Sequence, residues 1–212
     1  MKIALINGSP KPSKSNSEFM LQKLEPLILT GNEIFHYQLN RKPLSEVQYC
    51  ELCRMDALVF AFPLYIDAIP SHLFRMLVEL EKRMKAERKK DIFVYALINN
   101  GFFEGKQNCV ALEILQNWCL RSDLRFGQGV CHGAGEMIGS LQQVPLGHGP
   151  LKNLGAAMNS LADNIQSRSC GESLFISPNF PRFVWRFTAT HTFWNATAKK
   201  NGLKTYEILR RL

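Results

Sequence analysis

The sequence of 212 residues predicts an α/β fold with a doubly wound, five-stranded parallel sheet. Short β-type runs alternate along the chain with longer segments whose apolar residues recur at helical spacing, which is the pattern of a parallel sheet wrapped by helices. The run at residues 57–62 is apolar throughout, as expected of a central parallel strand that is covered on both faces. The hydrophobic and charged fractions, 46% and 21%, are ordinary for a soluble globular protein.

The first strand is expected at residues 2–7 (KIALIN), and a helix follows at 16–29. Apolar residues at spacings of three and four indicate the helix, and Gly31 marks its end. Pro26 lies inside this stretch and predicts a kink or an early end. The later elements follow in alternation, with strands at 33–39, 57–62, 91–99 and 125–131 and helices over 69–84, 111–118 and 151–165.

The chain changes character at residue 172. Beyond it, aromatic residues such as Phe183 and Trp194 are mixed with lysines and arginines. We therefore expect a domain at 1–171 and a C-terminal aromatic and basic extension at 172–212. Packing on the domain, or exchange with a second subunit, is the favoured role of the extension. The alternative is peripheral contact with a membrane, because aromatic and basic residues together are typical of interfacial segments.

The formal net charge of +8 comes largely from two basic clusters, one at residues 82–90 (KRMKAERKK) and one in the extension. Basic clusters attract nucleic acids, anionic lipids or anionic small molecules, but a basic run at the end of an amphipathic helix is more often its solvated face. We expect no nucleic-acid binding, because the sequence carries no recognised module for it.

The six cysteines are scattered, and a chain of this length does not need disulfides, so reduced thiols in the cytoplasm are expected. The chain starts without a signal-peptide pattern and has no apolar run of about 20 residues that would span a bilayer. Only Cys50 and Cys53 form a CxxC pair. Two ordinary thiols are the favoured interpretation of this pair, over a zinc site or a redox dithiol. The five histidines have no metal-ligand spacing, so no metal site is expected.

Three polar loops follow predicted strands and are expected to meet at the carboxyl edge of the sheet, where open α/β proteins bind ligands. They read NGSPKPSKSNS (7–17), PLYIDAIPSH (63–72) and NNGFFEG (99–105). The first loop has neither a dinucleotide fingerprint nor a P-loop. Its hydroxyls precede a helix N-terminus, which fits either plain N-capping or a bound phosphomonoester. With an aromatic wall in the second loop and close backbone approach in the third, the three together favour a mononucleotide with a flat ring.

The same three loops resemble the flavin loops of the flavodoxin-like NAD(P)H-dependent FMN reductases, which are relatives of the NAD(P)H quinone reductases and the iron–sulfur flavoproteins. The resemblance covers roughly residues 1–168. It implies a flavodoxin-like fold with strand order 2-1-3-4-5, noncovalent FMN, and a homodimer or homotetramer. The iron–sulfur relatives carry four cysteines between the second and third strands. Only Cys50 and Cys53 stand there in this chain, so no cluster is expected.

The resemblance also assigns cofactor-binding residues by position. The FMN phosphate would be bound by Ser9, Ser15, Asn16 and Ser17. The ribityl chain and the ring would be flanked by Pro63, Leu64, Tyr65 and Ile66. The pyrimidine edge of the flavin would be lined by Asn99, Asn100, Gly101 and Phe102. The segment HGAGE (132–136) is expected to close the same pocket, and no side chain is expected to act as a catalytic acid or base.

The function implied is transfer of reducing equivalents from NAD(P)H through FMN to a small acceptor such as a quinone, a nitro or azo compound, a metal ion or free flavin. Backbone N–H groups around Asn100 and Gly101 are expected to stabilise negative charge on the reduced ring. One alternative is a flavodoxin-type electron carrier without NAD(P)H turnover. The basic charge of this chain opposes it, because flavodoxins typically have acidic surfaces. The other alternative is a membrane-associated binding module on the same fold.

Overall fold

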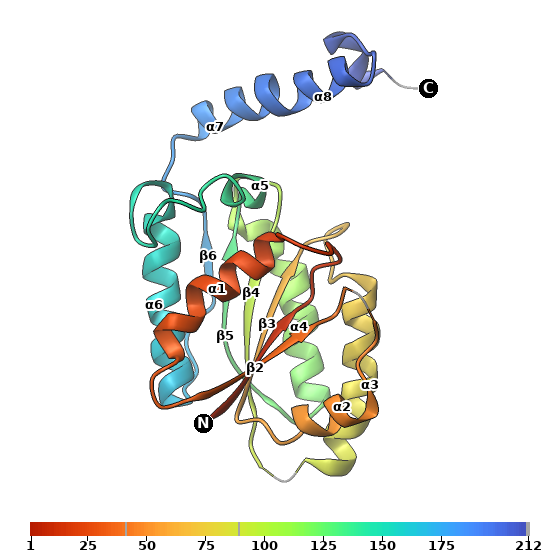
Figure 1. The fold of residues 1–212 in the computed structure, drawn as a ribbon, viewed down its shortest axis with the longest axis vertical. Coiled ribbons are helices and arrows are strands. Elements are labelled where there is room, and N and C mark those ends of the chain that lie inside the picture. Colours follow the sequence, from red (N-terminus) through yellow and green to blue (C-terminus); the bar gives the residue numbers. More distant parts are fainter. Residues whose placement is uncertain (41, 89, 211–212) are drawn as a thin grey trace. The chain divides into compact units, whose positions relative to one another are not determined.

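A computed structural model describes residues 1–40, 42–88 and 90–210 and divides the chain into two compact units, Met1–Pro178 and Asn179–Leu212. The first unit is an α/β domain with helices on both faces of a parallel sheet (Figure 1). Residues 172–178 thus belong to the same compact unit as the sheet.

The sheet has six parallel strands in the order β2-β1-β3-β4-β5-β6. Their bounds are Lys2–Asn7 (β1), Glu33–Gln38 (β2), Ala57–Pro63 (β3), Phe93–Asn99 (β4), Arg125–His132 (β5) and Leu174–Ile176 (β6). The order of the first five strands is the one that the family resemblance implied, but the predicted strand count of five was wrong. The added strand β6 pairs with β5, with Leu174 opposite Val130 and Ile176 opposite His132. A strand of three residues is too short to show an alternating pattern, so its sequence did not distinguish it from the extension.

The helices cover the sheet in two layers (Figure 1). One layer holds α1 (Asn16–Ile28) and α6 (Lys152–Ser167), and the other holds α2 (Glu46–Leu52), α3 (Ser71–Glu87) and α4 (Cys109–Arg121). Short turns at Gly105–Asn108 (η1), Gly135–Ile138 (α5) and Gly149–Leu151 (η2) complete the unit. Strands β3 and β4 are buried along nearly their whole length, because the sheet's two hydrophobic cores lie on either side of them.

Helix α1 begins where its capping residue predicts. The Oγ of Ser15 accepts a hydrogen bond from the backbone N–H of Glu18 at 3.0 Å, which satisfies one of the free donors of the first turn. Pro26 does not end the helix, which continues to Ile28. Leu24 and Ile28 are fully buried, and their packing holds the last turn in place despite the proline.

The basic cluster at 82–90 is an ion-paired surface at the C-terminal end of α3. Lys82, Lys85 and Lys90 each lie 2.7 Å from a carboxylate, on Glu79, Glu81 and Asp56 respectively. Arg83 and Arg88 also have carboxylate partners. The cluster is therefore a solvated face with its charge largely compensated, as the sequence favoured.

The second unit is a helical segment followed by a turn. It comprises α7 (Arg182–Thr188), a π-helical stretch at Ala189–Trp194 (η3), α8 (Asn195–Lys200) and the turn Thr205–Leu209 (η4). Among its described residues only one apolar side chain, Ala198, is buried. No helix in the described part of the chain is long and apolar enough to cross a bilayer.

Candidate functional site

The loops that follow β1, β3 and β4 meet at the carboxyl edge of the sheet around a cavity of about 130 Å³. Its lining residues are Ser9, Lys11, Asn16, Ser17, Pro63, Leu64, Tyr65, Asn99, Asn100, Gly101, Gly135 and Glu136. Nine of them are among the twelve cofactor-binding residues expected from the sequence. The fold thus brings together most of the residues that the three loops nominate.

The other three expected residues lie outside this cavity. Ser15 caps α1 and borders a neighbouring cavity instead. Ile66 is completely exposed at the tip of a turn. Phe102 is 53% exposed, and its N–H donates to the side chain of Asn100 at 2.8 Å. Loop geometry, and not loop membership alone, decides which side chains face the cavity, and cofactor binding by these three residues stays a prediction.

The first loop holds two buried hydroxyls next to the start of α1. Ser9 and Ser17 are 2% and 1% exposed. The Oγ of Ser9 accepts from the N–H of Lys11 at 3.3 Å, and the Oγ of Ser17 accepts from the side-chain amide of Asn99 at 3.2 Å. Each hydroxyl therefore keeps its own hydrogen for donation. For the N–H groups of Asn16 and Ser17, at the first positions of α1, no acceptor is found within the described residues.

The first loop is held in place by the side chain of Asn7 and by the packing of Gly8. Asn7 accepts from the N–H of Ser9 at 3.0 Å and donates to Gln38 on β2 at 2.9 Å. A Cβ at Gly8 would lie 2.8 Å from the Cδ2 of Leu73 and 3.2 Å from the Cβ of Phe62, so a larger residue here would force the packing between the loop and α3 to shift. Ser9 is consequently positioned by residues that do not line the cavity.

The second loop contains a tight turn at Tyr65–Ala68. The two end residues exchange backbone hydrogen bonds of 3.0 Å, and Ile66 and Asp67 between them have φ values of +48° and +57°. Two left-handed residues in a two-residue turn correspond to the type I′ geometry. Isoleucine is β-branched and rarely adopts this conformation, so the turn carries backbone strain beside the cavity. The turn leaves Tyr65, which is 47% exposed, on the cavity rim.

The third loop is tied to the segment after β5. The N–H of Asn100 donates to the carbonyl of His132 at 3.2 Å, and the N–H of Gly135 donates to the carbonyl of Asn100 at 2.6 Å. The Asn100 N–H is thus already engaged, contrary to the expectation that it would face a reduced ring. A Cβ at Gly101 would meet no atom within 4 Å, so its backbone faces open space. Within the described residues the N–H of Gly101 has no acceptor, which leaves it as the donor of this loop.

His132 lies at the end of β5 and is 1% exposed. Neither ring nitrogen has a hydrogen-bond partner among the described residues. Burial lowers the pKa of His132 to about 4, so the imidazole is neutral near pH 7. The sequence marked residues 132–136 as part of the pocket wall, and of these Gly135 and Glu136 line the cavity.

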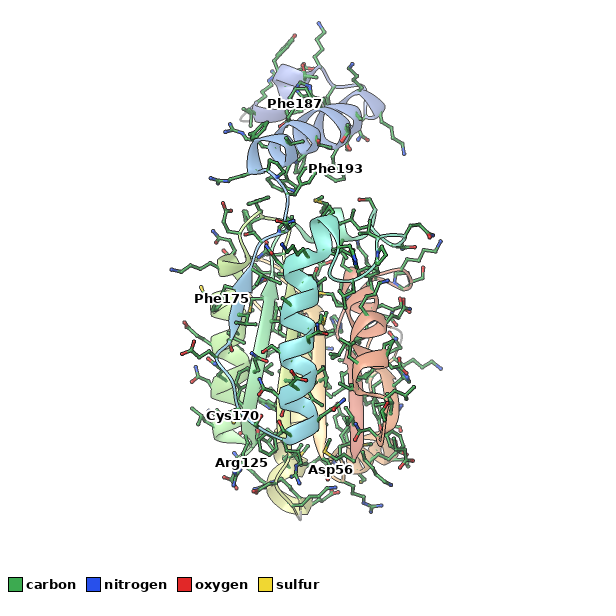
Figure 2. All side chains as sticks on the ribbon, turned by 90° about the vertical axis from the view of Figure 1, so that its left-hand side faces the viewer. Asp56, Arg125, Cys170, Phe175, Phe187 and Phe193 are labelled. Atoms are coloured by element: carbon green, nitrogen blue, oxygen red, sulfur yellow. The ribbon has the colours of Figure 1, made fainter. Side chains whose placement is uncertain are left out.

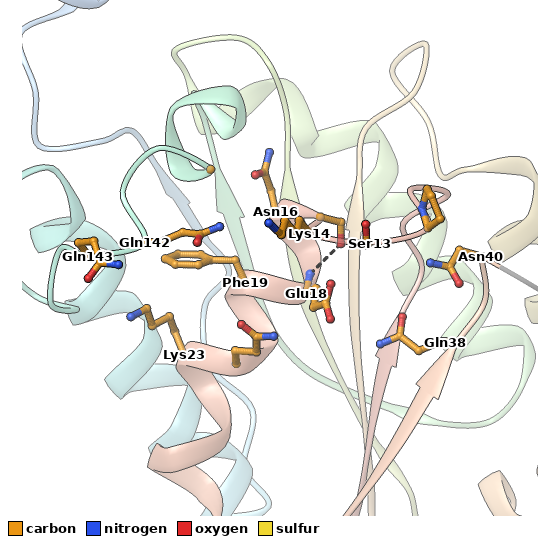
Figure 3. A pocket seen from close by; sticks show the side chains of 14 residues that line it. Ser13, Lys14, Asn16, Glu18, Phe19, Lys23, Gln38, Asn40, Gln142 and Gln143 are labelled. Atoms are coloured by element: carbon orange, nitrogen blue, oxygen red, sulfur yellow. Dashed lines mark hydrogen bonds between the residues drawn. The ribbon is translucent and has the colours of Figure 1, made fainter.

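A larger cavity of about 740 Å³ borders the first and shares Asn16 with it (Figure 3). Five side-chain amides besides Asn16 line it, together with Lys14 and Lys23: they are Gln22, Gln38, Asn40, Gln142 and Gln143. Ser15 and Asn16 in its wall are among the residues expected from the sequence. Its other amides had no signal in the sequence, because they come from α1, from the end of β2 and from the loop after α5, and they form no motif.

The CxxC pair is held in the thiol form. Burial raises the pKa of Cys53 to about 11, and a hydrogen bond to Glu87 raises the pKa of Cys50. A redox dithiol needs a thiolate near neutral pH, so these environments favour two ordinary thiols. Cys50 lies in α2 and Cys53 caps it, and this helix lies at the end of the domain opposite the carboxyl ends of the strands (Figure 1). No group of three or more potential metal ligands occurs within residues 1–40, 42–88 and 90–210.

No protein-family model matches the sequence, and no curated protein matches it either. Solved structures do match. An NADH:FMN oxidoreductase in its apo form is 16% identical, with a TM-score of 0.60 over 87% of this chain and 98% of its own. An NADPH-quinone reductase from P. pentosaceus is 12% identical, with a TM-score of 0.55 over 76% and 98%. An FMN-dependent NADH-azoreductase from Bacillus anthracis, in complex with FMN, is 13% identical, with a TM-score of 0.52 over 78% and 100%. The chain therefore has the flavodoxin-like fold that its loops implied.

Proposed function

We propose that this protein is an FMN-dependent oxidoreductase that passes reducing equivalents from NAD(P)H to a small acceptor. The observation that carries the proposal is the donor set of the smaller cavity. Ser9, Lys11, Asn16 and Ser17 all line it, and they bring two hydroxyls, a cationic side chain and the free N–H groups at the start of α1. Helix α1 adds the positive end of its dipole. Such a set suits a terminal phosphate better than a neutral ligand.

The rest of the cavity suits a flat ring. Leu64 and Tyr65 offer apolar and aromatic surface, and Gly101 offers a bare backbone with an unengaged N–H. The enclosed volume of about 130 Å³ is below the roughly 300 Å³ at the low end of ligand sites. A flavin mononucleotide would therefore fill the cavity with one part, while its ring extended along the open rim beside Tyr65.

Bound FMN would supply the hydride and electron transfer. The residues of this chain would hold it by the phosphate at α1, orient its ring between Tyr65 and the third loop, and donate the Gly101 N–H to negative charge at the ring edge. No acid or base among the cavity residues is required. The neighbouring structures bear names of enzymes that reduce FMN, quinones or azo compounds, and each of these acceptor classes is a candidate substrate.

The decisive experiment is to purify the protein, look for bound yellow flavin, and identify FMN after denaturation. Anaerobic mixing with NADPH and with NADH should then bleach the flavin absorbance rapidly and reveal which nucleotide is preferred. Slow bleaching with both nucleotides would favour a flavodoxin-type carrier. A colourless protein that cannot be reconstituted with FMN would refute the proposal at its base.

The proposed setting is the reducing cytoplasm, and all six cysteines are free thiols in the structure. A homodimer or homotetramer stays a prediction from the family resemblance. Sedimentation equilibrium of the flavin-loaded protein measures it directly.

A further inference from the structure

We propose that the C-terminal unit, Asn179–Leu212, binds the surface of anionic membranes, with its helical segment lying along the lipid headgroups. This inference rests on the composition and exposure of that unit and does not depend on the proposed flavin chemistry. It concerns a unit whose described residues do not line the cavity.

The first argument is charge. Residues 179–212 contain seven lysines and arginines but a single acidic residue, Glu207. The carboxylate of Glu207 accepts from the backbone N–H of Lys204 at 2.6 Å and so serves the turn that follows the helix. In α3, by contrast, each described cation at positions 82–90 has a carboxylate partner. The cations of the C-terminal cluster thus far outnumber the acidic residues of their own unit, whereas the described cations at positions 82–90 are paired with carboxylates.

The second argument is exposed apolar surface. Phe183 is 77% exposed, Trp194 56% and Leu209 88%, and Phe187 and Phe193 are exposed as well (Figure 2). Exposed aromatic side chains this dense are unusual on a unit of this size, because each costs free energy in water. They mark a surface that another phase or molecule covers.

The third argument is the arrangement along the helix. Phe183 and Phe187 are four residues apart in α7 and share a face, with Arg182 and Arg186 forming the adjacent row. Lys199 and Lys200 end α8. Rows of aromatic and basic residues side by side are the pattern of a helix that lies in the membrane interface, with rings in the acyl boundary and cations at the phosphates. The segment is not a spanning helix.

An anionic bilayer offers both what the positive charge of the unit needs and what its exposed apolar side chains need. A second copy of the unit would offer apolar surface but would bring the same excess of positive charge, so the two copies would repel each other. A nucleic acid would satisfy the charge but would leave rows of phenylalanine in contact with water. Lipid headgroups and the acyl boundary beneath them supply the negative charge and the apolar phase together.

The test is co-sedimentation of the full-length protein with vesicles of phosphatidylcholine containing phosphatidylglycerol, compared with phosphatidylcholine alone, at low and high salt. We expect binding to the anionic vesicles, weakened by salt, and a blue shift of tryptophan emission that is smaller in Trp194→Phe, where Trp185 of the same unit still contributes. The double variant Lys199→Ala/Lys200→Ala should lower the partition coefficient about 30-fold. Phe187→Ala/Trp194→Ala should lower it at least ten-fold.

Matched controls lie on α3. Lys82→Ala/Lys85→Ala removes the same number of cations, but paired ones, and should change partitioning less than about two-fold. Phe74→Ala/Val78→Ala removes exposed apolar side chains from the first unit and should have no effect. All variants change exposed residues, so circular dichroism should confirm that they are folded.

Several results would overturn the inference. Equal binding to neutral and anionic vesicles, or equal losses in the α3 controls, would remove the role of this unit. Absence of vesicle binding, with self-association that Phe187→Ala/Trp194→Ala abolishes, would identify a second copy as the partner. Salt-sensitive retention of nucleic acid without vesicle binding would identify that partner instead. Flavin content is measured in parallel, so a failure of either proposal is recognised separately.

Discussion

Asn99 is the residue through which the fold and the candidate site can be tested together. It is 3% exposed, and its side-chain amide donates to the Oγ of Ser17 at 3.2 Å and to the carbonyl of Phe62 at 3.3 Å. One side chain on β4 thus holds the first turn of α1 and the end of β3. The replacement Asn99→Ala removes both bonds and leaves their acceptors without a donor in a buried place.

The magnitude follows from these contacts. Loss of the two bonds and of their desolvated partners should lower the free energy of unfolding by about 2–3 kcal/mol. The hydroxyl of Ser17 would lose its orientation toward the cavity, and the affinity for FMN should fall about ten-fold, which corresponds to roughly 1.4 kcal/mol. FMN at 100 times its dissociation constant should stabilise the unaltered protein by about 2.7 kcal/mol, and the variant at the same concentration by only about 1.4 kcal/mol.

Urea unfolding followed by circular dichroism, with and without FMN, measures all of these quantities, and flavin fluorescence titration gives the affinities. Asn153→Ala is the matched control, because Asn153 makes one exposed bond to the carbonyl of Ser177 at 2.9 Å. The control should change stability by less than about 1 kcal/mol and FMN affinity not at all. If Asn99→Ala unfolds like the unaltered protein and binds FMN as tightly, the bridge from β4 to α1 does not organise the site.

Three further predictions concern single residues. Gly101→Ala should leave stability nearly unchanged, because its Cβ meets no protein atom within 4 Å, yet it should weaken FMN binding; unaltered flavin fluorescence titration would place the ligand elsewhere. Tyr65→Ala should weaken FMN binding or alter turnover with little cost in stability, since the ring is about half exposed; identical affinity and kinetics would remove Tyr65 from the site. Burial lowers the pKa of His132 from 6.5 to about 4, so between these pH values only the unfolded chain binds the proton. The free energy of unfolding should therefore fall by up to about 3 kcal/mol as the pH falls from 6.5 to 4. In urea unfolding, His132→Gln should lack this part of the pH dependence; an unchanged pH profile would show that the imidazole titrates normally.

Much of the site could be predicted from the sequence because parallel strands place the loops at their carboxyl ends along one edge. Residues such as Ser9, Asn16 and Asn99, each at or near the end of a strand or at a helix start, are positioned by the elements themselves. Ile66 and Phe102 were assigned by their place in a loop, and there the backbone decides: the left-handed turn directs Ile66 into solvent. The hydrogen bond from the N–H of Asn100 to the carbonyl of His132 could not be predicted either, because the two residues are distant in sequence.

The sequence by itself determined the alternation of strands and helices, the capped start of α1 and the three loops, since periodicity, capping and strand ends are local properties. Only the tertiary structure decided the place of the three-residue strand β6, which forms because the edge of β5 pairs with it. It also placed Lys11 in the cavity and paired the described cations at positions 82–90 with carboxylates, some of them far away in the sequence. Contacts between distant segments have no local signature in the sequence. For this reason the sequence could not show that the basic cluster at 82–90 is paired with carboxylates.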